Sequence, residues 1–276
     1  MSATHSTAPR SSKPLLRVEG VGVRFGGLVA LDDVSFDVHE GDMLGLIGPN
    51  GAGKTTMMRS IIGVVQPTSG TVLLDGESLN GMPIHKRVQR GLSLSQQLVK
   101  PLRGISIADN VAMAAASAKT GSPLSALLNV SDTKELEAAK AELARVGIAA
   151  VSSQSPGIQP LGVLKRLELA RALALKPRLL LLDEPLAGLN TQEARSLAST
   201  IAEINQQGLT VVLIEHNLGE VMRVCRRLVV LDNGKKIGDG EPQAVMRDQV
   251  VRAAYLGSGV SGQDDCNNQQ RETQHA

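Results

Sequence analysis

One short stretch, GPNGAGKTT from Gly48 to Thr56, limits the possible folds of this chain more than any other feature. It fits the pattern of a glycine, four variable residues and then Gly-Lys-Thr, and it lies between the apolar run MLGLI and the run TMMRSIIG. Its glycines let the backbone bend tightly, so that N–H groups converge on an anion at the N-terminus of the following helix. We therefore expect a strand, a phosphate-binding loop and a helix in succession.

Within this loop, two side chains have the chemistry that a bound triphosphate needs. Lys54 supplies a positive charge for the β and γ phosphates, and Thr55 supplies a hydroxyl for Mg²⁺. A glycine-rich turn that matches by chance is the alternative, and the flanking strand and helix argue against it. The expected ligands are ATP and Mg²⁺, and the predicted nucleotide-binding residues are Gly48, Pro49, Asn50, Gly51, Ala52, Gly53, Lys54, Thr55 and Thr56.

A second strand ends in two acids, in the sequence LLLLDEP. In folds built around a phosphate-binding loop, a neighbouring buried strand ends beside the phosphates, and an aspartate there holds Mg²⁺. Asp183 is the predicted residue for that role, and Glu184 is placed to orient and deprotonate an attacking water. Taken alone, the run favours a buried strand that ends in a turn. Together with the loop, it favours a catalytic site.

Strands and helices alternate along most of the chain. We expect helices from about residue 105, over 160–175 and over 192–206, and strands over 15–25, 34–38, 43–47, 71–74, 179–182 and 209–216. The alternation predicts an α/β fold with a mixed, mainly parallel sheet. The cluster of early strands predicts an antiparallel β subdomain beside it, and the run ELEAAKAELARVG belongs to an inserted α-helical subdomain.

The two ends of the chain differ in composition from the rest. Residues 1–14 and 258–276 are polar, so we expect disordered tails on either side of one domain over 15–257, with the helical subdomain at about 98–157. Neither Cys225 nor Cys266 has the spacing of a disulfide or a metal site, which favours reduced, structural thiols.

Composition narrows the classes of function. Aromatic residues make up 1% of the chain, tryptophan is absent and the net charge is +2, which argues against nucleic-acid recognition. No apolar stretch approaches the roughly 20 residues that a membrane-spanning helix needs. The N-terminus lacks the apolar stretch of a secretory signal, so a cytoplasmic location is expected.

With these motifs in place, the chain resembles the ATP-binding subunit of an ABC transporter. GPNGAGKTT and LLLLDEPLAGLN are similar to the Walker A, Walker B and D-loop sequences of that family, and the resemblance covers Leu15 to Gly257. It implies a P-loop NTPase core that hydrolyses ATP, and a homo- or heterodimer with a second ABC ATPase subunit. It also implies transmembrane permease subunits, a periplasmic binding protein as an indirect partner, and a peripheral position on the inner face of the cell membrane.

The resemblance also implies roles for single residues. Phe25 matches the aromatic residue that stacks on adenine, although its type alone suggests a core residue. Gln97, after Gln96 in SLSQQ, matches the glutamine that touches Mg²⁺ and reports to the membrane partner. His216 in VVLIEHN matches the histidine that contacts the γ-phosphate, and Asn190 stands where many relatives carry an aspartate. The implied catalytic set is Glu184, His216 and Gln97, and the implied ion-binding set is Thr55, Gln97 and Asp183.

The chain departs from the family at the helix that meets the nucleotide of the opposite subunit. Relatives usually have Leu-Ser-Gly-Gly-Gln there, whereas residues 159–163 are QPLGV. Gly162 is retained, but Pro160 replaces the serine. Proline suits the first turn of a helix. However, it lacks the serine hydroxyl, and a hydrogen bond from such a hydroxyl to a charged group typically contributes about 1.5 to 3 kcal/mol. We expect two unequal sites in a heterodimer with a typical partner, and two equally weakened sites in a homodimer.

The C-terminal stretch GKKIGDGEPQAVMRDQVVRAAYLG narrows the branch of the family. It is similar to the end of ATPases that serve importers of branched-chain or other hydrophobic amino acids, and also to lipopolysaccharide-export ATPases. Two functions outside transport stay open: a regulatory ATP-binding switch, and a soluble ABC ATPase that acts on nucleic acid or ribosomes. Glu184 argues against a pure switch, which needs no base.

Overall fold

The computed structural model describes residues 13–95, 101–120 and 133–257, and its centre is a six-stranded sheet. The strand order is β10-β9-β3-β8-β7-β6, and all neighbours are parallel except β9 and β10. The strands are β3 (Met43–Ile47), β6 (Leu92–Ser95), β7 (Leu179–Asp183), β8 (Thr210–Ile214), β9 (Arg227–Asp232) and β10 (Lys235–Gly240). Parallel strands place the ends of β3, β7 and β8 at one edge, where a ligand site of this fold class lies.

Side chains of the central strands alternate between two hydrophobic cores. In β7, Leu180 and Leu182 pack with the helices on one face, whereas Leu179 and Leu181 pack with the antiparallel sheet on the other. Because both faces are covered, a continuous apolar run is what such a strand requires. The run of leucines before Asp183 is therefore explained by burial on two sides.

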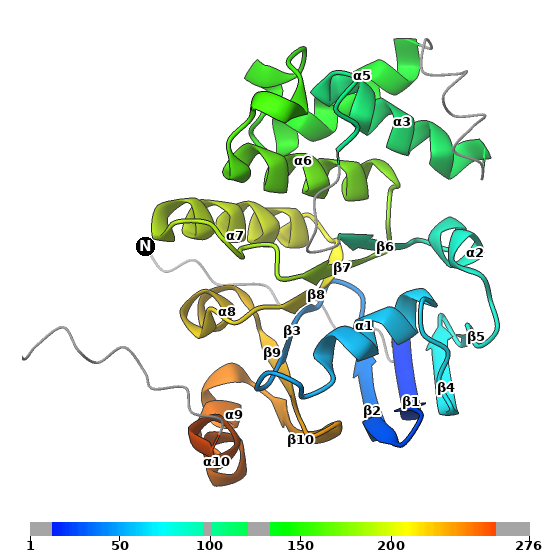
Figure 1. Ribbon diagram of the computed structural model, residues 1–276, viewed down its shortest axis with the longest axis vertical. Helices are drawn as coiled ribbons and strands as arrows, with labels where there is room; N and C mark the ends of the chain where they lie inside the picture. Colours follow the sequence, from blue (N-terminus) through cyan, green and yellow to red (C-terminus); the bar gives the residue numbers. More distant parts are fainter. Residues whose placement is uncertain (1–12, 96–100, 121–132, 258–276) are drawn as a thin grey trace, which may run out of the picture.

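A second, antiparallel sheet has the order β2-β1-β4-β5. Its strands are β1 (Leu16–Phe25), β2 (Leu28–Val38), β4 (Ser69–Leu74) and β5 (Glu77–Ser78). Strand β2 begins six residues earlier than the expected start at Val34, because its first residues pair with the end of β1 around a tight turn. Figure 1 shows this sheet beside α1 (Lys54–Ile62), near α2 (Ile84–Gln89).

The other helices lie in three sets. Figure 1 shows α3 (Ile107–Thr120), α5 (Thr133–Arg145) and α6 (Leu161–Ala174) together at the top, above α7 (Thr191–Gln206) and α8 (Leu218–Val224). Helices α9 (Pro242–Arg247) and α10 (Gln249–Gly257) lie at the other end, beside β9 and β10. Two short 3-10 helices, Ala149–Val151 and Pro156–Ile158, connect α5 to α6.

The architecture confirms the predicted α/β class, the mixed sheet and the antiparallel annex. Strands β5, β6, β9 and β10 and helices α2, α8, α9 and α10 were not singled out in the sequence. Gln97, Cys266 and nearly all of both tails lie outside the described residues, and the division into subdomains stays a prediction. Within the described ranges, every helix is too short or too polar to cross a lipid bilayer.

Candidate functional site

The loop between β3 and α1 has a backbone that only glycine allows. Gly48 has φ 146° and Gly53 has φ 100°, in the region that L side chains rarely adopt. A Cβ on Gly48 would lie 2.0 Å from the Leu231 carbonyl oxygen, and one on Gly53 would lie 2.7 Å from that of Ala30. The loop thus fits tightly between β9 and β2, with its N–H groups at the start of α1.

Lys54 is buried inside the loop, with 6% of the residue exposed. Its Nζ donates to the carbonyl oxygens of Gly48 at 2.7 Å and Pro49 at 2.9 Å. Burial lowers the pKa of Lys54, while the charges of Glu184 and Asp183 oppose that effect. The ammonium therefore lies between the loop carbonyls and the two acids, where a phosphate group would gain from its charge.

Asp183 ends β7 opposite Ile214 of β8. Burial, and then the charge of Glu184, raise the pKa of Asp183, against the effects of Arg59, Lys54 and a hydrogen bond from Thr55. Among the described residues, its buried Oδ1 has no hydrogen-bond partner. A hydroxyl and a free carboxylate oxygen are suitable ligands for Mg²⁺. In the described part of the chain no group of three or more acids, histidines or cysteines gathers, which fits an ion that is also held by waters and phosphate oxygens.

Glu184 and His216 form a pair at the exits of two neighbouring strands. His216 Nε2 lies 2.8 Å from Glu184 Oε1. The backbone of Glu184 is left-handed, with φ 52°, a conformation that few residues with a side chain adopt. It is held by a bond from its N–H to the Ile214 carbonyl oxygen at 3.0 Å and by Lys165 Nζ, 3.3 Å from its own carbonyl oxygen. The pair can hold and orient a water and accept its proton.

A pocket of about 330 Å³ brings these parts together. Phe25, which is 51% exposed, lines it together with the start of β2. The other lining residues that the sequence predicted are Asn50, Gly51, Ala52, Gly53, Lys54, Thr55, Thr56, Glu184 and His216. Gly48, Pro49 and Asp183 lie directly behind this lining, through the contacts described above. Phe25 is thus a surface residue at the pocket, and not the core residue that its type alone suggested.

Gly162 is not part of this pocket. It lies in the first turn of α6, where Pro160 is the N-cap and the Pro160 carbonyl oxygen accepts from the N–H groups of Val163 and Leu164. A Cβ on Gly162 would lie 3.0 Å from Glu193 Oε1. Glu193 and Asn190 cap α7 reciprocally, so Asn190 has a structural task in this chain. The helix begins at Leu161, so Pro160 is its N-cap and not, as the sequence had suggested, a residue of its first turn.

Three residues near the site were missed. Lys165 contacts Glu184, and Glu215 accepts from the backbone N–H groups of Leu186 and His216. The third residue, Tyr255, accepts a hydrogen bond from the backbone N–H of Gly48, which lowers the pKa of its hydroxyl. Burial has the larger effect and raises that pKa to about 12. Only Glu215 had a usable signal, because it is an acid at the end of an apolar strand, as Asp183 is.

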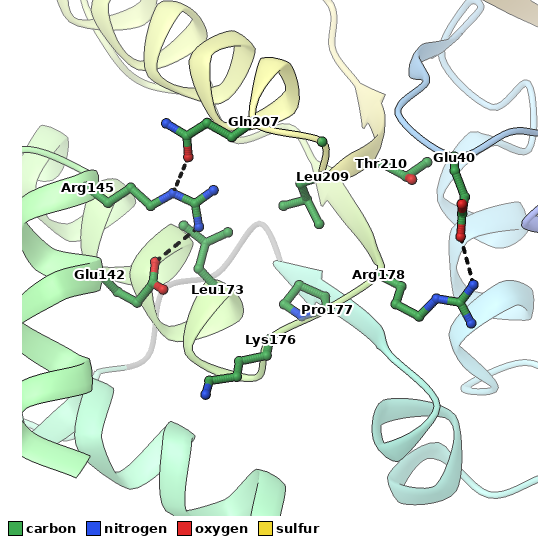
Figure 2. Close-up of a pocket in the computed structure, with 11 residues that line it drawn as sticks. Glu40, Glu142, Arg145, Leu173, Lys176, Pro177, Arg178, Gln207, Leu209 and Thr210 are labelled. Atoms are coloured by element: carbon green, nitrogen blue, oxygen red, sulfur yellow. Dashed lines mark hydrogen bonds and ion pairs between the residues drawn. The ribbon is translucent and has the colours of Figure 1, made fainter. Parts of the chain in front are cut away.

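A larger cavity, of about 470 Å³, lies at the opposite edge of the sheet, where β7 and β8 begin. Figure 2 shows Arg145 between Glu142 and Gln207, and Arg178 facing Glu40. Its arginines are therefore already paired with acids or amides of the same surface. The loop, Glu184 and His216 line the smaller pocket instead.

Two sequence families match parts of the chain. Residues 31–187 match the ABC transporter family, and residues 235–261 match a family described as the branched-chain amino acid ATP-binding cassette transporter. The first match contains the loop, Asp183 and Glu184. The second contains β10, α9 and α10.

Curated relatives match over nearly their whole length. The chain is 36% identical to the high-affinity branched-chain amino acid transport ATP-binding protein BraF of Pseudomonas aeruginosa, over 89% of this chain and 99% of that protein. It is 34% identical, with the same coverage, to the protein LivG of Escherichia coli, which has the same description. It is 31% identical to the lipopolysaccharide export system ATP-binding protein LptB of Haemophilus influenzae, over 88% of this chain and 97% of that protein.

Solved structures show the same architecture. The ADP conformation of MJ1267, an ATP-binding cassette of an ABC transporter, superposes with a TM-score of 0.80 at 28% identity, covering 89% of this chain and 100% of that chain. A nucleotide-free cassette superposes with a TM-score of 0.79 at 27% identity, covering 88% of this chain and 99% of that chain.

Proposed function

Because the chain belongs to the ABC transporter family of ATP-binding cassettes, we propose that it powers the uptake of branched-chain or other hydrophobic amino acids. It is an ATP-binding and ATP-hydrolysing subunit. The proposal for its chemistry depends most on one observation, the pair of Glu184 and His216, 2.8 Å apart, on the wall of the pocket that the phosphate-binding loop forms.

Binding is assigned to the loop and its neighbours. The N–H groups between Gly48 and Thr56 and the Lys54 ammonium hold the phosphates, and Phe25 covers the adenine. Thr55 and Asp183 are the residues that would hold Mg²⁺, and their hydrogen bond and the unpaired Asp183 oxygen support that assignment. A bound Mg²⁺ would neutralise charge that develops on the phosphates.

Hydrolysis is assigned to the two strand exits. The Glu184 carboxylate orients a water toward the γ-phosphate and takes its proton, while His216 fixes the carboxylate through its imidazole nitrogen. Burial of Lys54 and Asp183 strengthens the electrostatic interactions within the site. Two roles are assigned to Gln97, as a further Mg²⁺ ligand and as the link to a membrane partner. Both depend on the family resemblance alone.

Assembly follows from what one chain lacks. Gly162 lies outside the pocket, so we assign its helix to the nucleotide held by a second ABC ATPase subunit. Partner permeases would dock on the helical subdomain, about 98–157, and would place the chain at the inner face of the membrane. A periplasmic binding protein would be an indirect partner. Because ATP contacts the second subunit only in the closed dimer, ATP binding favours the closed state.

A Glu184→Gln variant tests the assigned chemistry. We expect the ATPase rate to fall by about 100- to 10,000-fold, the range for loss of a general base, while ATP binding persists and a dimer accumulates with ATP. Glu203→Gln is the matched control, because Glu203 is an exposed acid of α7 on no assigned surface. Full activity of Glu184→Gln would refute the assignment.

The transported solute needs a cellular test. Deletion of the gene should lower leucine uptake and leave lysine uptake unchanged, and re-expression of the chain, but not of its Glu184→Gln variant, should restore it. Normal leucine uptake together with a defect in lipopolysaccharide export would favour the second candidate, which the likeness to LptB supports. Normal uptake and export together would favour a regulatory ATPase.

A further inference from the structure

The assigned mechanism leaves unused one buried carboxylate that is adjacent to the catalytic pair. Glu215 directly follows β8 and precedes His216, and 5% of the residue is exposed. Burying a carboxylate is unfavourable unless hydrogen bonds replace the water that it loses. The partners that compensate for this burial therefore indicate what the side chain does.

Each carboxylate oxygen of Glu215 accepts from a different strand exit. The Leu186 N–H donates to Oε1 at 2.6 Å, and the His216 N–H donates to Oε2 at 3.2 Å. Leu186 lies two residues after Glu184, and β7 and β8 are paired neighbours up to Asp183 and Ile214. One side chain thus joins the segment that follows β7 to the segment that follows β8.

The two joined segments carry the catalytic pair. Glu184 has a left-handed backbone that its surroundings must hold in place, and its carboxylate contacts His216 across the gap between the strands. If either segment rotated, the two side chains would move apart. A displacement of about 1 Å in a catalytic group can lower a rate about 100-fold.

Charges around Glu215 make this bridge sensitive to protonation. Burial raises the pKa of Glu215, and the negative charge of Glu184 raises it further. The backbone hydrogen bonds from Leu186 and His216 and the charge of the His216 side chain lower it, but burial is the largest effect. A proton on one oxygen would put a donor where a backbone N–H needs an acceptor.

We propose that Glu215 is a positioning residue, which sets the separation of Glu184 and His216 by bridging the backbones of the two strand exits. Glu215 is not among the residues that line the nucleotide pocket. The inference rests on the proposed function, because it assumes that this pair catalyses hydrolysis.

Glu215→Gln tests the bridge, because an amide has the same size but can accept through only one of its two terminal atoms. In the full-length chain, kcat for ATP should fall by about 10-fold, while KM and the Kd for ATP stay within about twofold. The matched control is Asp42→Asn. Asp42 is also a buried carboxylate that accepts a backbone N–H, from His39 at 2.9 Å, but it precedes β3 at the opposite edge of the sheet. This control should keep the kcat of the natural chain.

The pH profile gives a second readout. In the natural chain kcat should fall as the pH drops through the raised pKa of Glu215, and Glu215→Gln should lack that step because it has no proton to gain. Unchanged kcat in Glu215→Gln, equal losses of kcat and affinity, or an identical acid limb would each overturn the proposal.

If Glu215→Gln does not fold, Glu215→Asp replaces it. That variant keeps the negative charge, but its side chain is one methylene shorter and cannot bridge both strand exits. We therefore expect kcat to fall again while the Kd for ATP is unchanged. A kcat equal to that of the natural chain would overturn the proposal. Failure of the proposed function would look different, because the natural chain itself would then not hydrolyse ATP or Glu184→Gln would remain active.

Discussion

Helices α1 and α6 both begin at surfaces assigned to nucleotide binding, but their first turns offer different groups. The start of α1 has Lys54, which is bonded to two loop carbonyls, and Thr55, whose side chain lowers the pKa of Asp183. The start of α6 has Pro160, then Leu161, which is 42% exposed, and Gly162, and among the described residues no side chain caps it. One end carries charge and hydroxyls, whereas the other offers only backbone N–H groups.

This difference separates two parts of the function. The groups assigned to ATP binding at α1 come from one chain, so we expect this site to bind ATP without help. We expect the α6 surface to contribute only weakly to a nucleotide held by another subunit, because only the helix dipole and backbone donors remain. The sequence should therefore weaken closure of the dimer more than the capture of ATP.

Lys54→Ala should have the largest effect on this comparison. Removing the ammonium should lower ATP affinity on the order of 100-fold, the upper range for a lost hydrogen bond between charged groups. Fluorescent-nucleotide titration measures it, with Lys86→Ala in α2 as the control for the loss of an exposed lysine. If both variants bind ATP equally well, the α1 site is not the nucleotide site.

Pro160→Ser should sharpen the comparison from the other side. A hydroxyl at this N-cap adds a donor and should raise the ATPase rate of the assembled complex by about 10-fold, with little change in the Kd of the single chain. Steady-state ATPase assays and equilibrium binding separate the two quantities. An unaltered turnover of the complex would mean that backbone groups already compensate.

Tyr255→Phe should have a smaller effect, confined to the α1 site. It removes the acceptor for the Gly48 N–H, so ATP affinity should fall by about threefold, the effect of a typical net hydrogen bond. Isothermal titration of the natural chain and the variant would show it. A loss as large as that of Lys54→Ala would mean that α10 holds the whole loop in place.

On the thermal stability of the nucleotide-free chain, Asp183→Asn should have a small effect. Because the folded-state pKa of Asp183 is raised, ionised Asp183 destabilises the fold at neutral pH, and this penalty disappears as the pH falls through the raised pKa toward 3.8. Without nucleotide, the variant should therefore melt at a higher temperature than the natural chain at pH 7, and the gain should shrink in acid. Calorimetry at several pH values tests this prediction. A gain in melting temperature that is the same at every pH would show that ionised Asp183 does not destabilise the fold.

The sequence predicted those parts of the site that local patterns determine. The loop glycines, Lys54 and the acids after a buried strand follow from spacing, and strand pairing explains why they meet. Contacts of Glu215, Lys165 and Tyr255 were not predictable, because each joins segments that only the folded chain brings together. The early start of β2 was missed because its first residues, Leu28 and Val29, show no alternation of apolar and polar side chains. They belong to the strand because they pair with the end of β1 across a turn.

The contact of Tyr255 with the phosphate-binding loop has a practical consequence. The chain has one tyrosine, two weakly emitting phenylalanines and no tryptophan, so its intrinsic ultraviolet emission comes mainly from this ring. Because the ring borders Gly48, its quantum yield should respond when the loop takes up a ligand. The protein therefore contains a built-in optical reporter, and label-free stopped-flow measurements could follow ligand capture in real time.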